Sequence, residues 1–450
     1  MKQNGTPLTA EAISAITNGQ ELYRIAKALI PGGTQLLSKR PELFLPDQWP
    51  SYYREARGCE VVALDGRRYL DMAIMGVSTC LLGYNDPDVT AAVVRRVQNG
   101  SMCTLNSPEE VELAQLLVEL HPWAEKVRFG RCGGETMDIA VRIARAKTGR
   151  DLVAICGYHG WHDWYLSANW GEGNLDGHLL PGLAPTGVPS QLAGTTLPFT
   201  YNKLDELEAI VNSHGSDLAA IVMEPTRMYE PQPGFLEGVR EIASRSGAVL
   251  VFDEVSIGWR LALGGAHLKY GVDPDIAVYA KALGNGHPSA AVVGRGEVMD
   301  AAQDSFISST YWTEGVGSTA ALAVIRKMQR VDVPAHIARI GTMLRKGMMG
   351  LAEKHGLPLT CAGHPPLPCF GFDHDDNLAL QTLYTRRMLD HDILASFAIS
   401  ICLAHTEEHI ERYLDAAAQV FPELAEAMQK GDAAERIGGP IRHTAFTRLA

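Results

Sequence analysis

The sequence predicts an α/β protein with a mostly parallel sheet, and three observations lead to this prediction. Short apolar runs recur from about residue 126 onward, as is typical of strands that are buried on both faces. Amphipathic helical stretches separate several of these runs, and glycines suited to a left-handed helix end close them. The chain has 450 residues, enough for a large core, and contains no internal repeat or low-complexity tract.

The apolar runs are expected to be the strands of one large domain. Helical stretches at 135–149 and 234–247 lie between them, and another at 107–120 precedes them. In the stretch 107–120, Ser107 is expected to cap the helix, Pro108 suits the first helical position, and Glu110 completes a capping box. The expected strands are KVRF (126–129), LVAIC (152–156), LAAIVM (218–223), AVLVF (248–252), IAVY (276–279) and AAVV (290–293).

The pattern of elements divides the chain into three segments. Residues 70–315 carry the alternation of strands and helices and form the expected large domain. After residue 316, long helices flank a polar, proline-rich stretch, so 316–450 is expected to form a smaller α+β domain at the C-terminus. Residues 1–69, which include the turn-rich LDGRRYLD, are expected to contribute to this smaller domain.

The charge balance argues against two classes of partner. Forty basic and fifty-two acidic side chains give a formal net charge of -12, which repels nucleic-acid phosphates and anionic membrane surfaces. A hydrophobic content of 46% and a charged content of 20% are ordinary for a globular protein. We therefore expect no nucleic-acid partner and no membrane association.

The cysteines and the N-terminal residues favour the cytoplasm. The first thirty residues mix polar side chains into every apolar window, so they predict neither a signal peptide nor a membrane span. Cysteines without CxxC spacing are typical of reduced thiols in a cytosolic protein. The eight cysteines are Cys59, Cys80, Cys103, Cys132, Cys156, Cys361, Cys369 and Cys402.

Polar residues that are unusual in buried strands stand where four predicted strands end. Asp253 follows AVLVF, Lys281 follows IAVY, Glu224 follows LAAIVM, and the segment GYHGWHDW follows LVAIC. Open parallel sheets bind ligands at the carboxyl ends of their strands, where loops and helix N-termini converge. We therefore expect these residues to form one site.

The residue types at these positions suit pyridoxal 5'-phosphate. A desolvated Lys281 has a lowered pKa and becomes a nucleophile that forms a Schiff base with a carbonyl. Asp253, on a neighbouring strand end, could keep a pyridinium nitrogen protonated, which this cofactor needs as an electron sink. Gly133 and Gly134 stand at a helix start, where free N–H groups attract a phosphate. Tyr158 offers an aromatic face for the ring.

Taken together, these motifs resemble the class III pyridoxal-phosphate aminotransferases. The resemblance implies the aspartate aminotransferase fold (fold type I), in which a large cofactor-binding domain holds a mostly parallel seven-stranded sheet beside a smaller α+β domain. The branch containing glutamate-1-semialdehyde aminomutase is the most similar. The motifs that carry the resemblance are ALIPGGTQ, YLDMAIMGVSTCLLGYNDPDV, CGGET, GYHGWHDW, MEP, GFLEGVREIASRSGAVLVFDEV and DIAVYAKALGNGHPSAAVVG.

The resemblance implies roles for three residues around the cofactor ring. Lys281 matches the lysine that holds the cofactor as a Schiff base and shuttles the proton. Asp253, in FDEV, matches the aspartate on the pyridine nitrogen. Val255, in the same motif, matches the aliphatic residue that backs the ring.

Five further residues have counterparts in the family. Tyr158 matches the aromatic residue stacked on the opposite face of the ring, with His159 beside it. Gly133 and Gly134 occupy the phosphate turn. Glu224 matches the glutamate near the 3-oxygen of the cofactor.

This sequence departs from the family pattern at three places. The phosphate turn reads CGGE, without the hydroxyl residue of many relatives, so backbone N–H groups carry more of the contact. The loop whose threonine reaches the phosphate of the other subunit reads SSTYWTEGVGSTAA, and either Thr310 or Thr313 fills that role. Lys39, followed by Arg40, stands where the glutamate-semialdehyde enzymes have an arginine that binds the substrate carboxylate. An ammonium does not bind a carboxylate bidentately, which disfavours semialdehyde activity.

The expected protein is thus a homodimeric, cytoplasmic aminotransferase, and the resemblance implies that its active sites lie at the subunit interface. It would move an amino group between small-molecule amines or amino acids and keto or aldehyde acceptors. An aminomutase like the glutamate-1-semialdehyde enzyme, or a racemase, uses the same residues and is the alternative. A non-catalytic binder on the same scaffold would lack the lysine, whereas Lys281 is present.

We expect no metal site. The segment HTEEH matches the zinc-protease pattern HxxEH. Thr406 nevertheless suits a helix N-cap, and Glu407 and Glu408 suit the first turn of an ordinary amphipathic helix. The segment HGWH has no third ligand nearby in the sequence.

Overall fold

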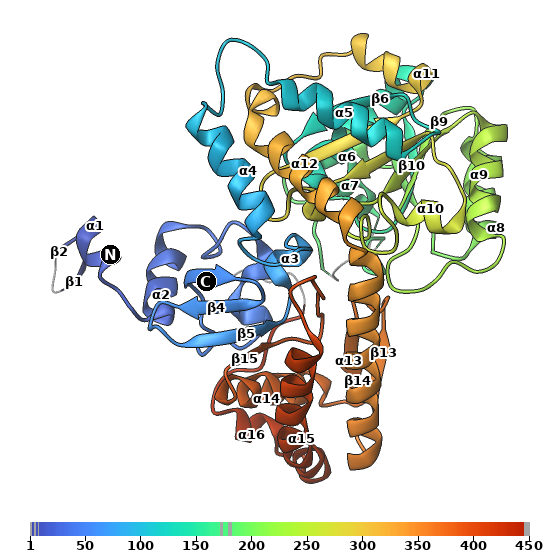
Figure 1. Cartoon of the computed structure of the whole chain (residues 1–450). Helices are drawn as coiled ribbons and strands as arrows, with labels where there is room; N and C mark the ends of the chain where they lie inside the picture. Colours follow the sequence, from blue (N-terminus) through green and yellow to red (C-terminus); the bar gives the residue numbers. More distant parts are fainter. Residues whose placement is uncertain (1, 4–5, 8, 172–173, 179–181, 445–450) are drawn as a thin grey trace. The chain divides into compact units, whose positions relative to one another are not determined.

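A computed structural model describes residues 2–3, 6–7, 9–171, 174–178 and 182–444 of the chain. The chain divides into two compact units (Figure 1). The first unit combines Met1–Asp86 with His336–Ala450, and the second unit is Pro87–Ala335.

These limits differ from the sequence-based boundaries at 69/70 and 315/316. Residue 70 lies inside strand β5 (Arg68–Met72) of the first unit, so a boundary there would cut a strand. Helices α4 (Pro87–Gln98) and α12 (Gly315–Arg330) pack against each other, so both belong to the second unit. Sequence patterning alone does not reveal this helix pairing.

Within the described residues of the second unit, seven strands form one sheet in the order β6-β12-β11-β10-β9-β7-β8. All the pairings are parallel except those of β12, which runs antiparallel to both of its neighbours. The six predicted runs are all strands, and the short edge strand β8 was not predicted. The strands are β6 (Lys126–Gly130), β7 (Leu152–Cys156), β8 (Thr196–Pro198), β9 (Leu218–Met223), β10 (Val249–Asp253), β11 (Ile276–Tyr279) and β12 (Ala290–Gly294).

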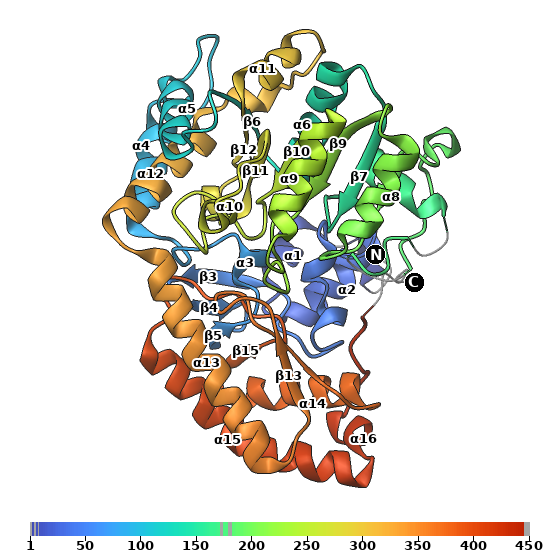
Figure 2. The same ribbon diagram turned by 90° about the vertical axis from the view of Figure 1, so that its right-hand side faces the viewer.

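Helices cover both faces of this sheet, as the apolar sequences of its strands require. On β7, Val153 and Ile155 join the apolar cluster that contains helix α6, whereas Ala154 and Cys156 join the cluster that contains α8 and α9. Successive strand side chains point to opposite faces, so α6 lies on one face, and α8 and α9 lie on the other (Figure 2). The bounds are α6 (Gly133–Thr148), α8 (Leu204–His214) and α9 (Phe235–Ser246).

The helix ends test the capping predictions. Gly149 after α6 and Gly247 after α9 have left-handed φ values of 67° and 70°, as expected of C-cap glycines. Helix α5 (Pro108–Leu120) begins at the predicted proline, but the predicted capping box is wrong. The Ser107 hydroxyl donates to the Glu109 carboxylate and accepts no hydrogen bond from the backbone of the first turn.

The remaining elements of the second unit are short. They connect the strands and the long helices. The helices are α7 (Asp163–Leu166), α10 (Ala266–Tyr270) and α11 (Gly296–Met299), and the 3-10 helices are η3 (Ser167–Trp170), η4 (Ser190–Leu192), η5 (Lys281–Gly284), η6 (Asp300–Gln303) and η7 (Thr310–Thr313).

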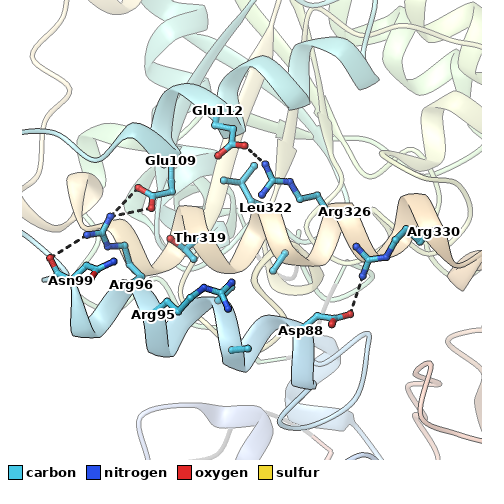
Figure 3. A pocket seen from close by; sticks show the side chains of 13 residues that line it. Asp88, Arg95, Arg96, Asn99, Glu109, Glu112, Thr319, Leu322, Arg326 and Arg330 are labelled. Atoms are coloured by element: carbon cyan, nitrogen blue, oxygen red, sulfur yellow. Dashed lines mark hydrogen bonds and ion pairs between the residues drawn. The ribbon is translucent and has the colours of Figure 1, made fainter.

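A groove of about 450 Å³ lies where α4, α5 and α12 meet (Figure 3). Ion pairs across it connect α12 to both of the other helices and connect α4 to α5. The two pairs made by α12 are exposed, and each stabilises the fold by no more than about 1 kcal/mol. We therefore interpret the groove as a surface groove between packed helices. The pairs drawn are Arg96–Glu109 at 3.0 Å, Arg326–Glu112, and Arg330–Asp88 at 3.0 Å.

The first unit is α+β. A four-stranded sheet in the order β15-β5-β4-β3 joins strands from the two ends of the chain, and β13 pairs with β14. Helix α13 (Val333–His355) runs across the division between the units. The other strands are β1 (Lys2–Gln3), β2 (Thr6–Pro7), β3 (Tyr53–Arg57), β4 (Glu60–Ala63), β13 (Leu359–Ala362), β14 (Cys369–Phe372) and β15 (Ile393–Ala395).

The helices of the first unit include one that begins inside the HTEEH motif. Thr406 accepts from His409 N at the start of α15, as predicted for an N-cap. Both ring nitrogens of His405 are already hydrogen-bonded, one to Cys402 N and the other to Asp71 O. The helices are α1 (Ala10–Ser14), α2 (Gly19–Leu29), η1 (Leu37–Lys39), η2 (Pro41–Leu43), α3 (Met75–Ser78), α14 (Asn377–Asp390), α15 (Glu407–Lys430) and α16 (Ala433–Ile437).

In the part of the chain that the structure describes, no helix combines the length and the apolarity that a membrane crossing requires.

Candidate active site

The polar residues predicted at the strand ends share one edge of the sheet. Strands β11, β10, β9 and β7 are consecutive and parallel, so their carboxyl ends lie side by side. Asp253 ends β10, and Glu224 follows β9 directly. Lys281 stands two residues after β11, and Tyr158 two residues after β7. All of these residues belong to the second unit.

Lys281 is held in an unusual state. Its φ of 45° lies in the left-handed region, which residues other than glycine rarely adopt. Its Nζ donates to Ser256 Oγ at 2.7 Å. The pKa of Lys281 is lowered to about 8, mainly by burial and also by the Arg260 cation, although Glu224 and Asp253 act in the opposite direction. A neutral amine is therefore accessible near neutral pH.

Asp253 is buried, with 3% of its surface exposed, and each of its oxygens accepts one hydrogen bond. Val255 N donates to Oδ1 at 2.9 Å, and His159 Nδ1 donates to Oδ2 at 2.8 Å. A carboxylate oxygen has two acceptor positions. The two donors therefore fix the carboxylate and leave one acceptor position on each oxygen for a further donor.

Glu224 connects the ends of β9 and β7. Its Oε2 accepts from Tyr158 N at 3.1 Å and from Arg227 Nη1 at 3.3 Å. Arg227 also donates to His178 O at 3.0 Å. The charge of Glu224 raises the pKa of Arg227. The absence of a side chain at Gly157 allows Glu224 to lie this close to the backbone, because a Cβ there would lie 2.6 Å from Glu224 Oε2.

The two residues after Gly157 have different surroundings. Tyr158 packs edge-on against Tyr165, with ring centroids 5.9 Å apart, and burial and the Asp253 charge raise the pKa of its hydroxyl. His159 is buried and stacks on Trp164 at 6.4 Å. Its Nε2 has no hydrogen-bond partner among the described residues, which leaves a buried polar atom available to a bound molecule.

The start of α6 is packed so closely that it needs glycine. A Cβ on Gly133 would lie 2.7 Å from Val255 Cγ1, so Gly133 and Val255 are neighbours. A Cβ on Gly160 would lie 2.8 Å from Gly134 Cα. Gly133 and Gly134 are the first two residues of the helix, where N–H groups have no partner within the helix.

Gly160 gives a test of this close approach. Its φ of +102° and the contact with Gly134 both oppose a side chain, whereas Gly149 has a φ of +67° and open space around it. Gly160→Ala is expected to lower the free energy of unfolding by about 2–5 kcal/mol, and Gly149→Ala by about 1 kcal/mol. Urea unfolding of the two variants measures the difference. Equal losses of unfolding free energy in the two variants would show that the close approach of Gly160 to Gly134 does not make the substitution more costly.

The predicted threonines lie on η7 in an exposed loop. The Thr313 hydroxyl donates to Thr310 O at 3.2 Å. Arg131, which stands just before α6, donates to Tyr311 O and to Glu314 O, both at 2.7 Å. The structure thus connects this loop to the start of α6, and it brings neither threonine to the lysine or the acid within one chain.

Sequence reasoning missed three residues of this site. Ser256 and Arg227 each stand three positions after a predicted residue, in FDEVS and MEPTR, so the motifs contained a signal for both. Arg260 carried no signal, because arginine is ordinarily a surface residue. It is 1% exposed, its Nη1 donates to Ser256 O at 2.7 Å, and burial lowers its pKa to about 10.

A lysine and an acid at adjacent strand ends of a mostly parallel sheet, with a glycine-started helix nearby, define a pyridoxal-phosphate enzyme of fold type I. Comparison with known proteins agrees. The family model described as aminotransferase class-III matches residues 46–361. The chain belongs to the class III aminotransferase family, and its cofactor is pyridoxal phosphate.

Relatives of this chain have two kinds of activity in their names. A 3-aminobutyryl-CoA aminotransferase of Cloacimonas acidaminovorans is 30% identical over 422 residues, covering 91% of this chain and 98% of the relative. A glutamate-1-semialdehyde 2,1-aminomutase of Roseiflexus castenholzii is 32% identical over 438 residues, covering 92% and 99%. The solved FumI protein of Sphingopyxis sp. MTA144, a pyridoxal-phosphate internal aldimine form, has a TM-score of 0.83 at 25% identity and covers 92% and 98%. The predicted resemblance and fold class are confirmed.

The residues at the strand ends fit this cofactor. The buried Asp253 carboxylate retains an acceptor position for a ring N–H. The amine of Lys281 has a lowered pKa, as a carbonyl-reactive lysine requires. The bare backbone of Gly133 and Gly134 allows a phosphate to approach the N-terminus of the 16-residue α6.

Proposed function

We propose that this protein transfers an amino group between a small amine or amino acid and a keto or aldehyde acceptor, with Lys281 as the residue that binds the cofactor covalently. The observation that carries the proposal is the placement of Lys281 and Asp253 at the ends of two adjacent parallel strands, with the lysine pKa lowered by burial. Pyridoxal phosphate, when bound, supplies an electron sink for the carbanion formed at the substrate carbon.

We propose that the other predicted residues make the remaining contacts with the cofactor. Asp253 would hold the ring nitrogen, with Val255 on one face of the ring and Tyr158 on the other. The N–H groups of Gly133 and Gly134 would bind the phosphate, and Thr310 or Thr313 would reach the phosphate of the partner subunit's cofactor. His159 and Glu224 would complete the site, His159 by orienting Asp253 and Glu224 on the 3-oxygen side.

The chain's own groups have three tasks in this reaction. Lys281 Nζ accepts and returns the proton at the substrate carbon, and a neutral amine is required to accept it. Asp253 keeps negative charge next to the ring nitrogen, which is electrostatic stabilisation placed where charge develops. His159 donates to Asp253 Oδ2 and so fixes the carboxylate orientation.

Lys281 also gives a prediction for the cofactor-free protein. Covalent attachment of pyridoxal phosphate needs the neutral amine, so its rate is expected to rise about tenfold per pH unit below pH 8 and to level off above it. An ordinary lysine, with a pKa of 10.5, would show a rate that still rises at pH 10. Borohydride fixation at each pH, followed by peptide quantification, measures attachment at Lys281 separately from the exposed Lys269. A Lys281 midpoint near 10.5 would contradict the buried amine.

We further propose that the protein is a cytoplasmic homodimer whose active sites lie at the subunit interface. None of the eight cysteines, all of which the structure describes, is joined in a disulfide, which supports a reducing compartment. The exposed position of Thr310 and Thr313 supports a role toward a second subunit. Measurement of the particle size in solution tests the dimer. Shared sites are tested by mixing chains that carry Lys281→Ala with chains that carry Thr310→Ala and Thr313→Ala and measuring the activity of the mixture. Recovery of activity on mixing requires that one site use residues of both chains.

An aminomutase is the second candidate, and a specific observation supports it: a relative with that name matches 92% of this chain. Lys39, in place of an arginine, argues against it. Incubation with an amine plus pyruvate, and separately with glutamate 1-semialdehyde, distinguishes the two functions. A keto product with alanine supports transfer, whereas 5-aminolevulinate alone would overturn it.

A further inference from the structure

A set of buried polar side chains lies beside the candidate active site and takes part in none of the roles proposed above. One member follows Asp253 directly in the sequence, and another stands two positions before Lys281. Each member has 0% of its surface exposed. We call this set the clasp, and it consists of Glu254, His267, Tyr279 and His121.

Glu254 is a buried carboxylate with three N–H donors. Ala266 N donates to Oε2, and His267 N and Nδ1 both donate to Oε1, each at 2.9 Å. Trp123 Nε1 donates to His267 Nε2 at 3.0 Å, so the ring proton of His267 lies on Nδ1 and points at Glu254. A buried charge without such partners would strongly destabilise the fold. The three bonds therefore attach the end of β10 to the start of α10.

Tyr279 and His121 form the second half of the clasp. Burial lowers the pKa of His121 to about 4, so its ring is neutral. Its Nδ1 donates to Leu117 O at 2.7 Å, and its Nε2 accepts from the Tyr279 hydroxyl at 2.8 Å. The His121 ring lies against the His267 ring, with centroids 5.8 Å apart. The ends of β10 and β11 are thus joined through stacked histidines.

The clasp closes around two glycines. A Cβ on Gly265 would lie 2.4 Å from His267 Nδ1, 2.6 Å from the Tyr279 hydroxyl and 2.7 Å from Glu254 Oε1. Gly264 has a φ of +108°, and a Cβ there would lie 3.0 Å from His121 Nε2. All four side chains therefore crowd against this glycine pair, and no larger residue fits without displacing them.

The clasp fixes both ends of the loop 255–265. Glu254 precedes the loop, and the residues that donate to its carboxylate follow the loop directly. Inside the loop, Ser256 accepts the hydrogen bond from Lys281 Nζ, and Arg260 donates to the Ser256 carbonyl. The loop therefore supplies both a hydrogen-bond partner and a buried cation to the lysine.

We propose that Glu254 is a positioning residue, which acts with His267 to hold the loop 255–265 so that Ser256 and Arg260 stay against Lys281. This inference rests on the role proposed above for Lys281. Glu254 touches neither the lysine nor the cofactor site in this arrangement. It acts through the loop that covers the amine.

A looser loop changes the surroundings of Lys281 in a predictable direction. Four charged groups face its Nζ: Arg260 and Arg227 favour the neutral amine, and Glu224 and Asp253 favour the protonated amine. Burial is the largest influence and favours the neutral form. Water entering beside a displaced loop, together with a more distant Arg260, raises the pKa of Lys281. The groups that face Glu254 itself are His267, His121 and Tyr279.

The test uses the full-length, cofactor-free protein and follows covalent attachment of pyridoxal phosphate to Lys281 as a function of pH. Glu254→Gln keeps the side-chain shape but offers one acceptor oxygen to three donors. It is expected to raise the midpoint by about one pH unit, so attachment at pH 7 becomes about tenfold slower. His267→Phe, which removes the ring N–H, is expected to shift the midpoint in the same direction. This variant replaces Glu254→Gln in the test if Glu254→Gln does not fold.

Asp275→Asn is the matched control for lost stability. Asp275 precedes β11, at the opposite end of the strand from Lys281, and is ion-paired with Arg240 and Arg295. It is expected to lower stability without moving the midpoint. A folded Glu254→Gln or His267→Phe variant with an unchanged midpoint overturns the inference. Failure of the wild-type protein to attach pyridoxal phosphate at Lys281 would overturn the proposed function instead.

Discussion

Lys281→Ala is expected to lower kcat for transamination at least about 10³-fold, because it removes the group that moves the proton at the substrate carbon. The covalent attachment of the cofactor is lost with it. Lys281→Arg should lower kcat to a similar extent, since a guanidinium retains the charge but remains protonated and does not act as the nucleophile. Steady-state kinetics with an amine and pyruvate, with circular dichroism to confirm folding, measures the effect.

Lys269→Ala is the matched control for the lysine. Lys269 is exposed in the same unit, where it pairs with Glu230 at 2.9 Å. Its loss should leave kcat unchanged. Partial recovery of Lys281→Ala by added methylamine would support proton transfer as the missing step. Full turnover of Lys281→Ala without any added amine would contradict the role of the lysine.

Asp253→Asn is expected to lower kcat by about 10²–10³-fold, the usual range for one group that stabilises developing charge. The amide keeps the size of the side chain but removes the negative charge beside the ring nitrogen. It also places an NH₂ group against one of the two donors that now fix the carboxylate, His159 Nδ1 and Val255 N. Rapid mixing of the holoenzyme with an amine measures the half-reaction directly.

The control for the acid is Asp273→Asn, an exposed carboxylate just before β11. It should leave the half-reaction rate unchanged. An Asp253→Asn variant that binds the cofactor and reacts at the wild-type rate would show that the ring nitrogen needs no charged partner here. That outcome would remove Asp253 from the mechanism while leaving the fold assignment intact.

The sequence predicted the strand ends well for a physical reason. The runs that end at Asp253 and before Lys281 are apolar at every position, which a strand buried on both faces requires. The polar residue that ends each run therefore marks the carboxyl edge of the sheet. The chemistry of Lys281 and Asp253 could be inferred from their types and from this shared edge.

Other features depend on tertiary packing and could not be predicted. Arg260 is buried by its loop and not by any local pattern, and its influence on Lys281 follows only from that burial. Strand β8 has three residues and ends in proline, which gives too short a pattern to recognise. The contact of Ser256 with Lys281 joins residues 25 positions apart. Such contacts are set by how the strands and the loop are packed.

The boundaries of the two units also depend on tertiary packing. Residues 87–98 and 315–330 form two helices that lie far apart in the sequence, and neither sequence pattern indicates that they pack together. The structure pairs them, so the second unit includes all of α12 and extends to Ala335, beyond the predicted end at 315. Helix pairing of this kind follows from complementary surfaces, which a single sequence does not reveal.

The most direct test of the central claim is peptide mapping of the purified protein after borohydride reduction in the presence of pyridoxal phosphate. We expect one stable pyridoxyl group, carried by the peptide that contains Lys281, together with loss of the visible absorbance near about 420 nm. A pyridoxyl group found mainly on a different lysine, or no group at all on a folded protein saturated with cofactor, would contradict it.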